Sequence, residues 1–122
     1  MALIVVVEDT PANLALATKL LSAAGHDVAI ANTGADGIRL VAERSPDLVL
    51  MDLGLPDIGG REAMRTIRST LADGPRLKVI AFTAHAMVGD RERALADGFD
   101  GYLSKPIEFA TFVESVEALL GE

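Results

Sequence analysis

The chain has 122 residues, half of them hydrophobic, which suffices for one folded domain with a real core but hardly for two. It contains no cysteine, which excludes disulfides, thiolate metal sites and cysteine nucleophiles and fits a reducing compartment. The formal net charge of -7 argues against direct binding of nucleic acid and favours a cation or a basic partner. No apolar run is long enough to span a membrane and no secretory signal is evident, so we expect a cytoplasmic protein without membrane insertion.

The first half of the chain alternates between apolar runs and amphipathic segments. A β-branched run at residues 2–7 predicts a buried parallel strand, and Pro11 suits the first turn of the helix that follows. Apolar residues at a spacing of four indicate the packed face of this helix: Leu16, Leu20 and Ala24, with Ala17. Gly25 ends the helix. The same pattern then predicts another strand and another helix, at residues 26–31 and 33–44.

The second half repeats this alternation. Residues 47–52 predict a central strand buried on both faces, and a loop rich in Gly and Pro follows it. The remaining elements are, in order, a helix at 61–71, a strand at 77–82, a helix from about 86 to 97, a weaker strand at 99–103 and a helix at 108–120. Strand–helix alternation of this kind predicts an α/β fold, a doubly wound parallel sheet with helices on both faces. We expect one domain, residues 1–122, without an output domain.

The predicted strands end in groups that share a chemistry. Ligands of open parallel sheets bind beyond the carboxyl ends of the strands. All strand ends except the second carry a charged or hydroxyl group there: Glu8 and Asp9, Asp52, Thr83 and Lys105. Clustered carboxylates repel one another, and Mg²⁺, which prefers oxygen ligands, relieves that repulsion. A carboxylate can also attack a phosphoryl group, whose oxygens a cation, an ammonium and a hydroxyl would stabilise.

Each of these residues, taken alone, has an ordinary structural role. An Asp after a strand often caps the next helix, and a single Lys usually lies on the surface. Their joint occurrence at the strand ends indicates a site that accepts a phosphoryl group.

Five motifs resemble the receiver domains of bacterial two-component response regulators over essentially the whole chain. They are Val-Val-Glu-Asp (6–9), Asp-Leu-Val-Leu-Met-Asp-Leu-Gly-Leu-Pro (47–56), Gly-Gly (59–60), Phe-Thr-Ala (82–84) and Lys-Pro (105–106). The resemblance implies a flavodoxin-like sheet with strand order 2-1-3-4-5 and five helices. It fits both stand-alone regulators of the DivK kind and the receivers of hybrid histidine kinases.

The resemblance also implies a phosphoacceptor and a metal site. Asp52 would be the residue that is phosphorylated. Glu8, Asp9 and Asp52 would hold Mg²⁺, directly or through water, and the backbone carbonyl of Gly54 would be a further ligand. Many members of the family have Asp where this chain has Glu8, and either carboxylate preserves metal binding.

Further implied roles belong to residues at the last two strand ends. Lys105 would pair with Asp52 at rest and with the phosphoryl group afterwards, and its bond to Pro106 would be cis. Thr83 would swing toward a phosphoryl oxygen, and Tyr102 would turn inward with it as the switch aromatic. His85, two residues after Thr83, either influences the lifetime of the phosphoryl group or is an ordinary loop residue.

The implied function is signalling. A histidine kinase or histidine phosphotransferase would be the phosphodonor, and a downstream protein would be the target. The domain would catalyse only its own phosphorylation and dephosphorylation, so it would not be an enzyme in the usual sense. Leu14, placed off the packed face of the first helix, is expected to be exposed and to insert between kinase helices, or else to be an ordinary surface leucine.

Three other functions are compatible with parts of the pattern. A phosphatase of the haloacid dehalogenase type would need a second Asp at position 54, where this chain has Gly54. A flavodoxin-like cofactor binder would need a phosphate-cradling loop where Glu8 and Asp9 stand. A degenerate receiver would interact with partners without being phosphorylated.

Overall fold

The computed structural model describes residues 2–70, 77–84 and 89–121. Within them, five strands form one parallel sheet in the order β2-β1-β3-β4-β5. The strands are β1 (Leu3–Val7), β2 (Asp27–Ala31), β3 (Leu48–Met51), β4 (Lys78–Thr83) and β5 (Gly101–Ser104). The helices are α1 (Pro11–Ala23), α2 (Gly34–Arg44), α3 (Gly60–Thr70), α4 (Asp90–Asp97) and α5 (Phe112–Leu120). The predicted flavodoxin-like fold and its strand order are confirmed.

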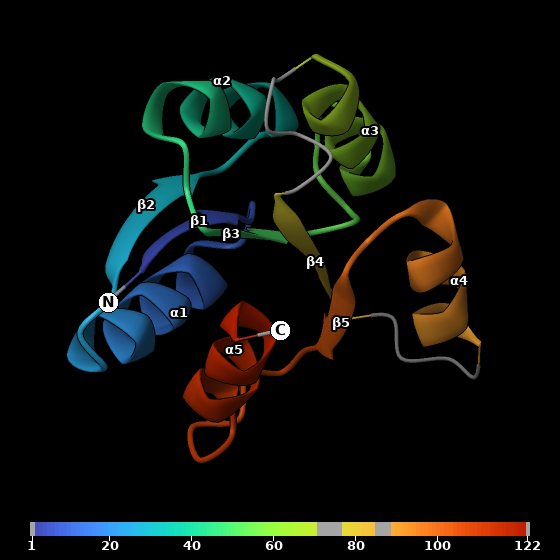
Figure 1. Cartoon of the computed structure of the whole chain (residues 1–122). Helices are drawn as coiled ribbons and strands as arrows, with labels where there is room; N and C mark the ends of the chain where they lie inside the picture. The colour runs from blue at the N-terminus through green and yellow to red at the C-terminus, as the bar shows by residue number, and fades with distance from the viewer. Residues whose placement is uncertain (1, 71–76, 85–88, 122) are drawn as a thin grey trace.

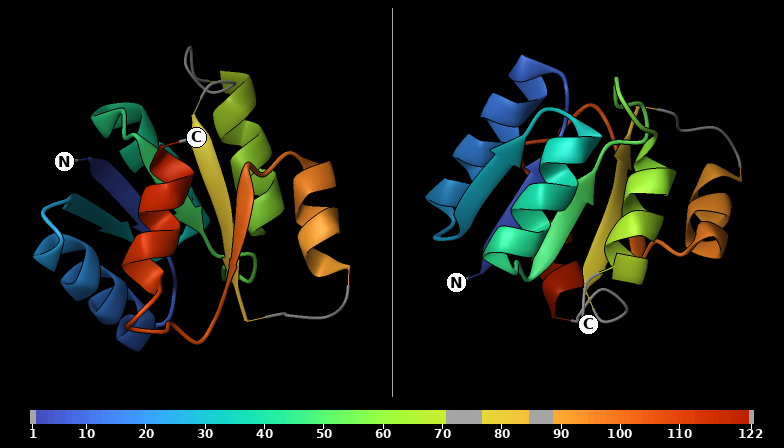
Figure 2. Two further views of the ribbon diagram at one scale, coloured as in Figure 1. Left: turned by 60° about the horizontal axis from the view of Figure 1, so that its bottom comes forward. Right: turned by 90° about the horizontal axis from the view of Figure 1, so that it is seen from above.

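Helices cover both faces of the sheet (Figure 1). One apolar cluster packs α2, α3 and α4 against one face, and a second packs α1 and α5 against the other. The two views of Figure 2 show α1 and α5 in front of the sheet on the left, and α2 and α3 in front on the right. The central strand β3 is buried at every position, as its unbroken apolar run predicts. No helix in the described part of the chain is long and apolar enough to cross a membrane.

The face of α1 that packs against the sheet differs from the prediction. Its buried residues are Leu14, Ala17 and Leu21, at a spacing of three and four, whereas the predicted Ala24 is exposed. Leu14 is 9% exposed and belongs to the core cluster beneath α1 and α5. The expectation that Leu14 is an exposed kinase-docking residue is therefore wrong. The helix is apolar on more than one side, so the spacing of its leucines did not identify the inner face.

Helix α5 begins later than predicted, and helix α4 is described from Asp90 onward. Gly89 adopts a left-handed φ of 91° and precedes the described start of α4 at Asp90. The predicted start near residue 86 lies outside the described residues, as does residue 71, the predicted end of α3. Before α5, the backbone N–H groups of Thr111 and Phe112 both donate to the carbonyl of Glu108. These bonds form a separate turn, so α5 begins only at Phe112. The amino-acid composition of the turn resembles that of a helix, which is why the prediction included it.

The carboxyl end of α5 is attached to the edge of the sheet where the strands begin. The ammonium of Lys78, at the start of β4, donates to the carbonyl of Leu119 at 2.7 Å. The His26 ring accepts a hydrogen bond from the backbone N–H of Ala2 at 3.1 Å and lies 2.8 Å from the Glu117 carboxylate. His26 thus connects the start of the chain to α5, on the edge opposite the carboxyl ends of the strands.

Candidate functional site

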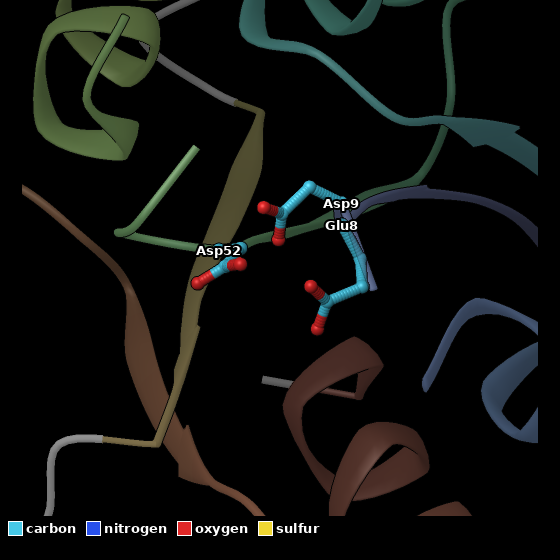
Figure 3. A group of neighbouring side chains, drawn as sticks. All are labelled: Glu8, Asp9 and Asp52. Atoms are coloured by element: carbon cyan, nitrogen blue, oxygen red, sulfur yellow. The ribbon is translucent and has the colours of Figure 1, made fainter. Parts of the chain in front are cut away.

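Three acidic side chains meet where β1 and β3 end. Glu8 and Asp9 follow β1, Asp52 follows β3, and their carboxylates face a common space (Figure 3). One oxygen from each carboxylate lies within 4.8 Å of the others. Glu8 is fully buried and Asp52 is 5% exposed, while Asp9 lies on the surface. The sequence prediction that these residues converge is therefore confirmed by the geometry.

Backbone hydrogen bonds between neighbouring strands continue beyond the ends of the strands and include residues of the site. The N–H of Glu8 donates to Ala31, and that of Asp52 donates to Val7, each at 3.0 Å. The N–H of Lys105 donates to Thr83 at 2.9 Å. Strand pairing therefore fixes where these site residues stand.

Lys105 lies between the two buried carboxylates. Its ammonium forms a close ion pair with Glu8 and a second one with Asp52 at 3.4 Å. It also lies 5.1 Å from the centroid of the Phe82 ring. The peptide bond between Lys105 and Pro106 is cis, as the family resemblance implies. The resting pair of Lys105 with Asp52 is present, but Glu8 is the nearer partner.

Burial and neighbouring groups shift the two buried carboxyls in opposite directions. Burial, reinforced by Asp52, raises the pKa of Glu8, even though Lys105 and the backbone of Thr10 stabilise its charge. Burial also disfavours ionisation of Asp52, but the N–H of Gly54, Glu8 and the charge of Lys105 outweigh it and lower the pKa of Asp52. These interactions favour the ionised form of Asp52, which is the form in which a carboxylate acts as a nucleophile.

The donor set fits a hard divalent cation. Three ionised carboxylates and one ammonium carry an excess of negative charge, which a bound cation would balance. The buried Oε1 atom of Glu8 has no hydrogen-bond partner among the described residues and lies against the ammonium of Lys105. Oxygen ligands with room for water are the environment that Mg²⁺ prefers.

The other residues singled out in the sequence lie around this cluster. Thr83 is buried at the end of β4, and Tyr102 is half-buried on β5 against the apolar cluster beneath α2, α3 and α4. Burial, with a contribution from Asp90, raises the pKa of Tyr102. The N–H of Gly54 donates to Asp52 at 3.1 Å. His85 lies outside the described residues.

Two residues have contacts that the sequence alone does not predict. The sequence places Phe82 in a buried strand and a motif, and its ring contacts the Lys105 ammonium. It places Asp57 in a Gly- and Pro-rich loop, and the carboxylate accepts hydrogen bonds from the first two N–H groups of α2. Its partners are 22 and 23 residues away in sequence, so no local pattern could have indicated them.

The sequence matches the response regulator receiver domain family over residues 4–117. The chain belongs to this family. A curated relative, the polar-differentiation response regulator DivK of Brucella ovis, is 35% identical over 119 residues, which cover 98% of this chain and 96% of the relative. Family membership removes the phosphatase and the flavodoxin-like cofactor binder from the alternatives.

Solved structures agree with this assignment. The receiver domain of a Pseudomonas aeruginosa sensor histidine kinase, with a magnesium ion coordinated in its active-site cleft, is 34% identical, with a TM-score of 0.88 over 99% of this chain and 98% of its own. A CheY-like receiver domain protein from Methanospirillum hungatei is 27% identical, with a TM-score of 0.87 over 99% of this chain and 94% of its own. Both predicted kinds of relative, DivK and a kinase receiver, are among these matches.

Proposed function

We propose that residues 1–122 form one receiver domain in which Asp52 accepts a phosphoryl group in a Mg²⁺-dependent reaction. The observation that carries this proposal is the position of the buried Asp52 beside two further carboxylates and the ammonium of Lys105. Glu8, Asp9, Asp52 and the backbone carbonyl of Gly54 would hold the cation. Bound there, Mg²⁺ would neutralise phosphoryl oxygens as charge moves between donor and acceptor.

The residues of the chain would perform the transfer as follows. A carboxylate oxygen of Asp52 attacks phosphorus, an Asp–phosphoryl bond forms, and the bond from phosphorus to the donor breaks with its electrons on the departing donor. Lys105 shifts its charge toward the new phosphoryl oxygens, while Glu8 retains part of its ion pair. Water reverses the modification by attacking phosphorus, which breaks the Asp52–phosphoryl bond, returns its electrons to the Asp52 carboxylate and releases inorganic phosphate. The Thr83 hydroxyl donates a hydrogen bond to a phosphoryl oxygen in the modified state.

The output would be a change of surface. Thr83 and Tyr102 lie on the neighbouring strands β4 and β5, close to where both strands end. Movement of Thr83 toward the phosphoryl group would open space into which the half-buried Tyr102 ring turns. A cytoplasmic histidine kinase or histidine phosphotransferase would supply the phosphoryl group, and a downstream protein would read the altered surface. The protein would catalyse only its own phosphorylation and dephosphorylation.

Intact mass measured after incubation with acetyl phosphate, with and without Mg²⁺, tests the proposal. We expect the wild-type protein to gain one phosphoryl group only when Mg²⁺ is present. Asp52→Asn should gain none, because an amide is not a nucleophile for phosphorus. Asp27→Asn, which changes an exposed acid on the edge strand, is the matched control and should behave as wild type.

Labelling of Asp52→Asn at the wild-type level would overturn the assignment of the acceptor. A wild-type protein that neither takes up phosphoryl nor binds beryllofluoride with Mg²⁺ would be a degenerate receiver. Phosphorylation by a kinase but not by acetyl phosphate would agree with the proposal and would mean that the protein accepts the phosphoryl group from a kinase and not from a small phosphodonor.

A further inference from the structure

The loop between β3 and α3 (residues 52–59) is bound to the amino end of α2 through Asp57. One carboxylate oxygen of Asp57 accepts from the N–H of Gly34 at 2.7 Å, and the other accepts from the N–H of Ala35 at 2.9 Å. These are the first two N–H groups of a helix, which have no acceptor within the helix itself. A carboxylate also suits the partial positive charge at a helix amino end.

The remaining N–H groups of this helix end are satisfied locally. Thr33, the N-cap of α2, accepts from Asp36 through its hydroxyl at 3.1 Å and from Gly37 through its carbonyl at 3.0 Å. Capping of α2 is therefore divided between its own N-cap and a residue of the β3–α3 loop. Of the two caps, only Asp57 connects the helix to the loop that follows Asp52.

Only two residues separate Asp57 from Gly54, and both are constrained. Leu55 is 8% exposed and packs in the cluster beneath α2, α3 and α4. The ring of Pro56 restricts its φ to a narrow range. On the other side, Gly54 donates its N–H to the Asp52 carboxylate. The backbone of Gly54 is thus held between Asp52 and a short, stiff connection to Asp57.

The loop also makes close contacts at two glycines. A Cβ atom on Gly34 would lie 2.4 Å from Cγ1 of Ile58, the residue after Asp57. A Cβ atom on Gly60, just past the loop, would lie 2.2 Å from the carbonyl oxygen of Asp52. The loop therefore fits its neighbours closely at both ends, and the Asp57 hydrogen bonds hold it in this fit.

We propose that Asp57 is a positioning residue for cation binding: by holding the β3–α3 loop against α2, it fixes the backbone of Gly54 beside the carboxylates that bind Mg²⁺. This inference rests on the proposed function, because it concerns the same cation site. Asp57 itself does not contact the ion. Its role is to reduce the rearrangement that the loop undergoes when the cation binds.

Calorimetric titration of the phosphate-free protein with MgCl₂ tests the inference. We expect Asp57→Ala to raise the dissociation constant about tenfold, the lower end of the range for residues that support metal ligands. Asp57→Asn keeps one acceptor oxygen and should give a smaller rise in the same direction. Thr33→Ala is the matched control, because it removes a cap from the same helix end without touching the loop, and it should stay within about twofold of wild type.

Amide hydrogen exchange gives a second readout. Binding and loop order are reciprocally coupled, so Mg²⁺ should slow exchange at Gly34 and Ala35 in the wild-type protein. In Asp57→Ala these amides should exchange quickly with and without Mg²⁺. Equal dissociation constants for Asp57→Ala and wild type, or an equal rise in Thr33→Ala, would overturn the inference while leaving the proposed function intact. A wild-type protein that binds no Mg²⁺ would instead overturn the proposed function.

Discussion

The ammonium of Lys105 lies over the face of the Phe82 ring, 5.1 Å from its centroid. Phe82 in turn packs against Phe112 of α5, with the ring centroids 6.0 Å apart. The aromatic face holds the cation in the position from which it reaches both Glu8 and Asp52. A core phenylalanine therefore helps to orient Lys105, whose ammonium carries positive charge into the cluster.

Phe82→Leu should slow phosphorylation by acetyl phosphate roughly fivefold at saturating Mg²⁺, because a cation–π contact of about 1 kcal/mol no longer orients Lys105. A time course of intact mass measures the rate. Phe112→Leu is the control, since it replaces the neighbouring ring with a smaller side chain and leaves the contact between Lys105 and Phe82. Its rate of phosphorylation should match that of wild type. If Phe112→Leu were phosphorylated as slowly as Phe82→Leu, the slower rate would result from general loosening of the core and not from the lost contact with Lys105.

Asp9→Asn should stabilise the metal-free protein. Removing one of three neighbouring negative charges relieves repulsion, and we expect the free energy of unfolding to rise by about 1 kcal/mol. With Mg²⁺ at a hundred times its dissociation constant, the wild type should gain about 2.7 kcal/mol, and the variant much less. Urea unfolding with and without Mg²⁺ measures both quantities. An Asp9→Asn protein that Mg²⁺ stabilises as strongly as wild type would remove Asp9 from the cation site.

Asp57 should make stability depend on pH in the acid range. Hydrogen bonds from the backbone of Ala35 and Gly34 lower the pKa of Asp57 below its usual 3.8. Because the pKa of Asp57 is lower in the folded protein than in the unfolded chain, its carboxylate stabilises the fold. This contribution is fully present above the pKa of the unfolded chain and is lost as the pH falls through the pKa of the folded protein. The stability difference between wild type and Asp57→Asn should therefore shrink as urea unfolding is repeated from pH 6 down to about pH 3. The difference between wild type and Thr33→Ala should change little over that range.

Gly34→Ala should destabilise the protein by about 2 kcal/mol, because the new methyl group would overlap Ile58. Ile58→Ala removes the overlapping atoms, so the double variant should recover part of the loss made by Gly34→Ala. A double-mutant cycle measured by urea unfolding gives the coupling. Strict additivity of the two changes would mean that the helix end and the loop move apart freely.

Much of the fold was predictable because its signals are local. The all-apolar run at 48–51 reads as a strand buried on both faces, and the structure buries every residue of it. The site residues were predictable for a related reason: the carboxyl ends of parallel strands meet at one edge of the sheet, which places Glu8 and Asp52 on the same edge. Their roles in phosphoryl transfer remain predictions that the experiments above address.

The missed features depend on contacts between distant segments. Leu14 was assigned to the wrong side of α1 because leucines occur on several sides of that helix, and only packing against α5 and the sheet selects one. The role of Asp57 depends on α2 lying beside the β3–α3 loop. The contact of Lys105 with Phe82 arises from the pairing of two strands. Spacing along the chain contains none of this information.

The bonds of Lys78 to α5 and of His26 to Ala2 and Glu117 place both Ala2 and the end of α5 on the sheet edge where strands begin. The acidic cluster lies on the other edge. A linker or fluorescent label attached next to Ala2 or Gly121 would therefore lie away from the cluster. Binding of a candidate kinase could then be measured on immobilised protein with the acidic cluster directed into solution.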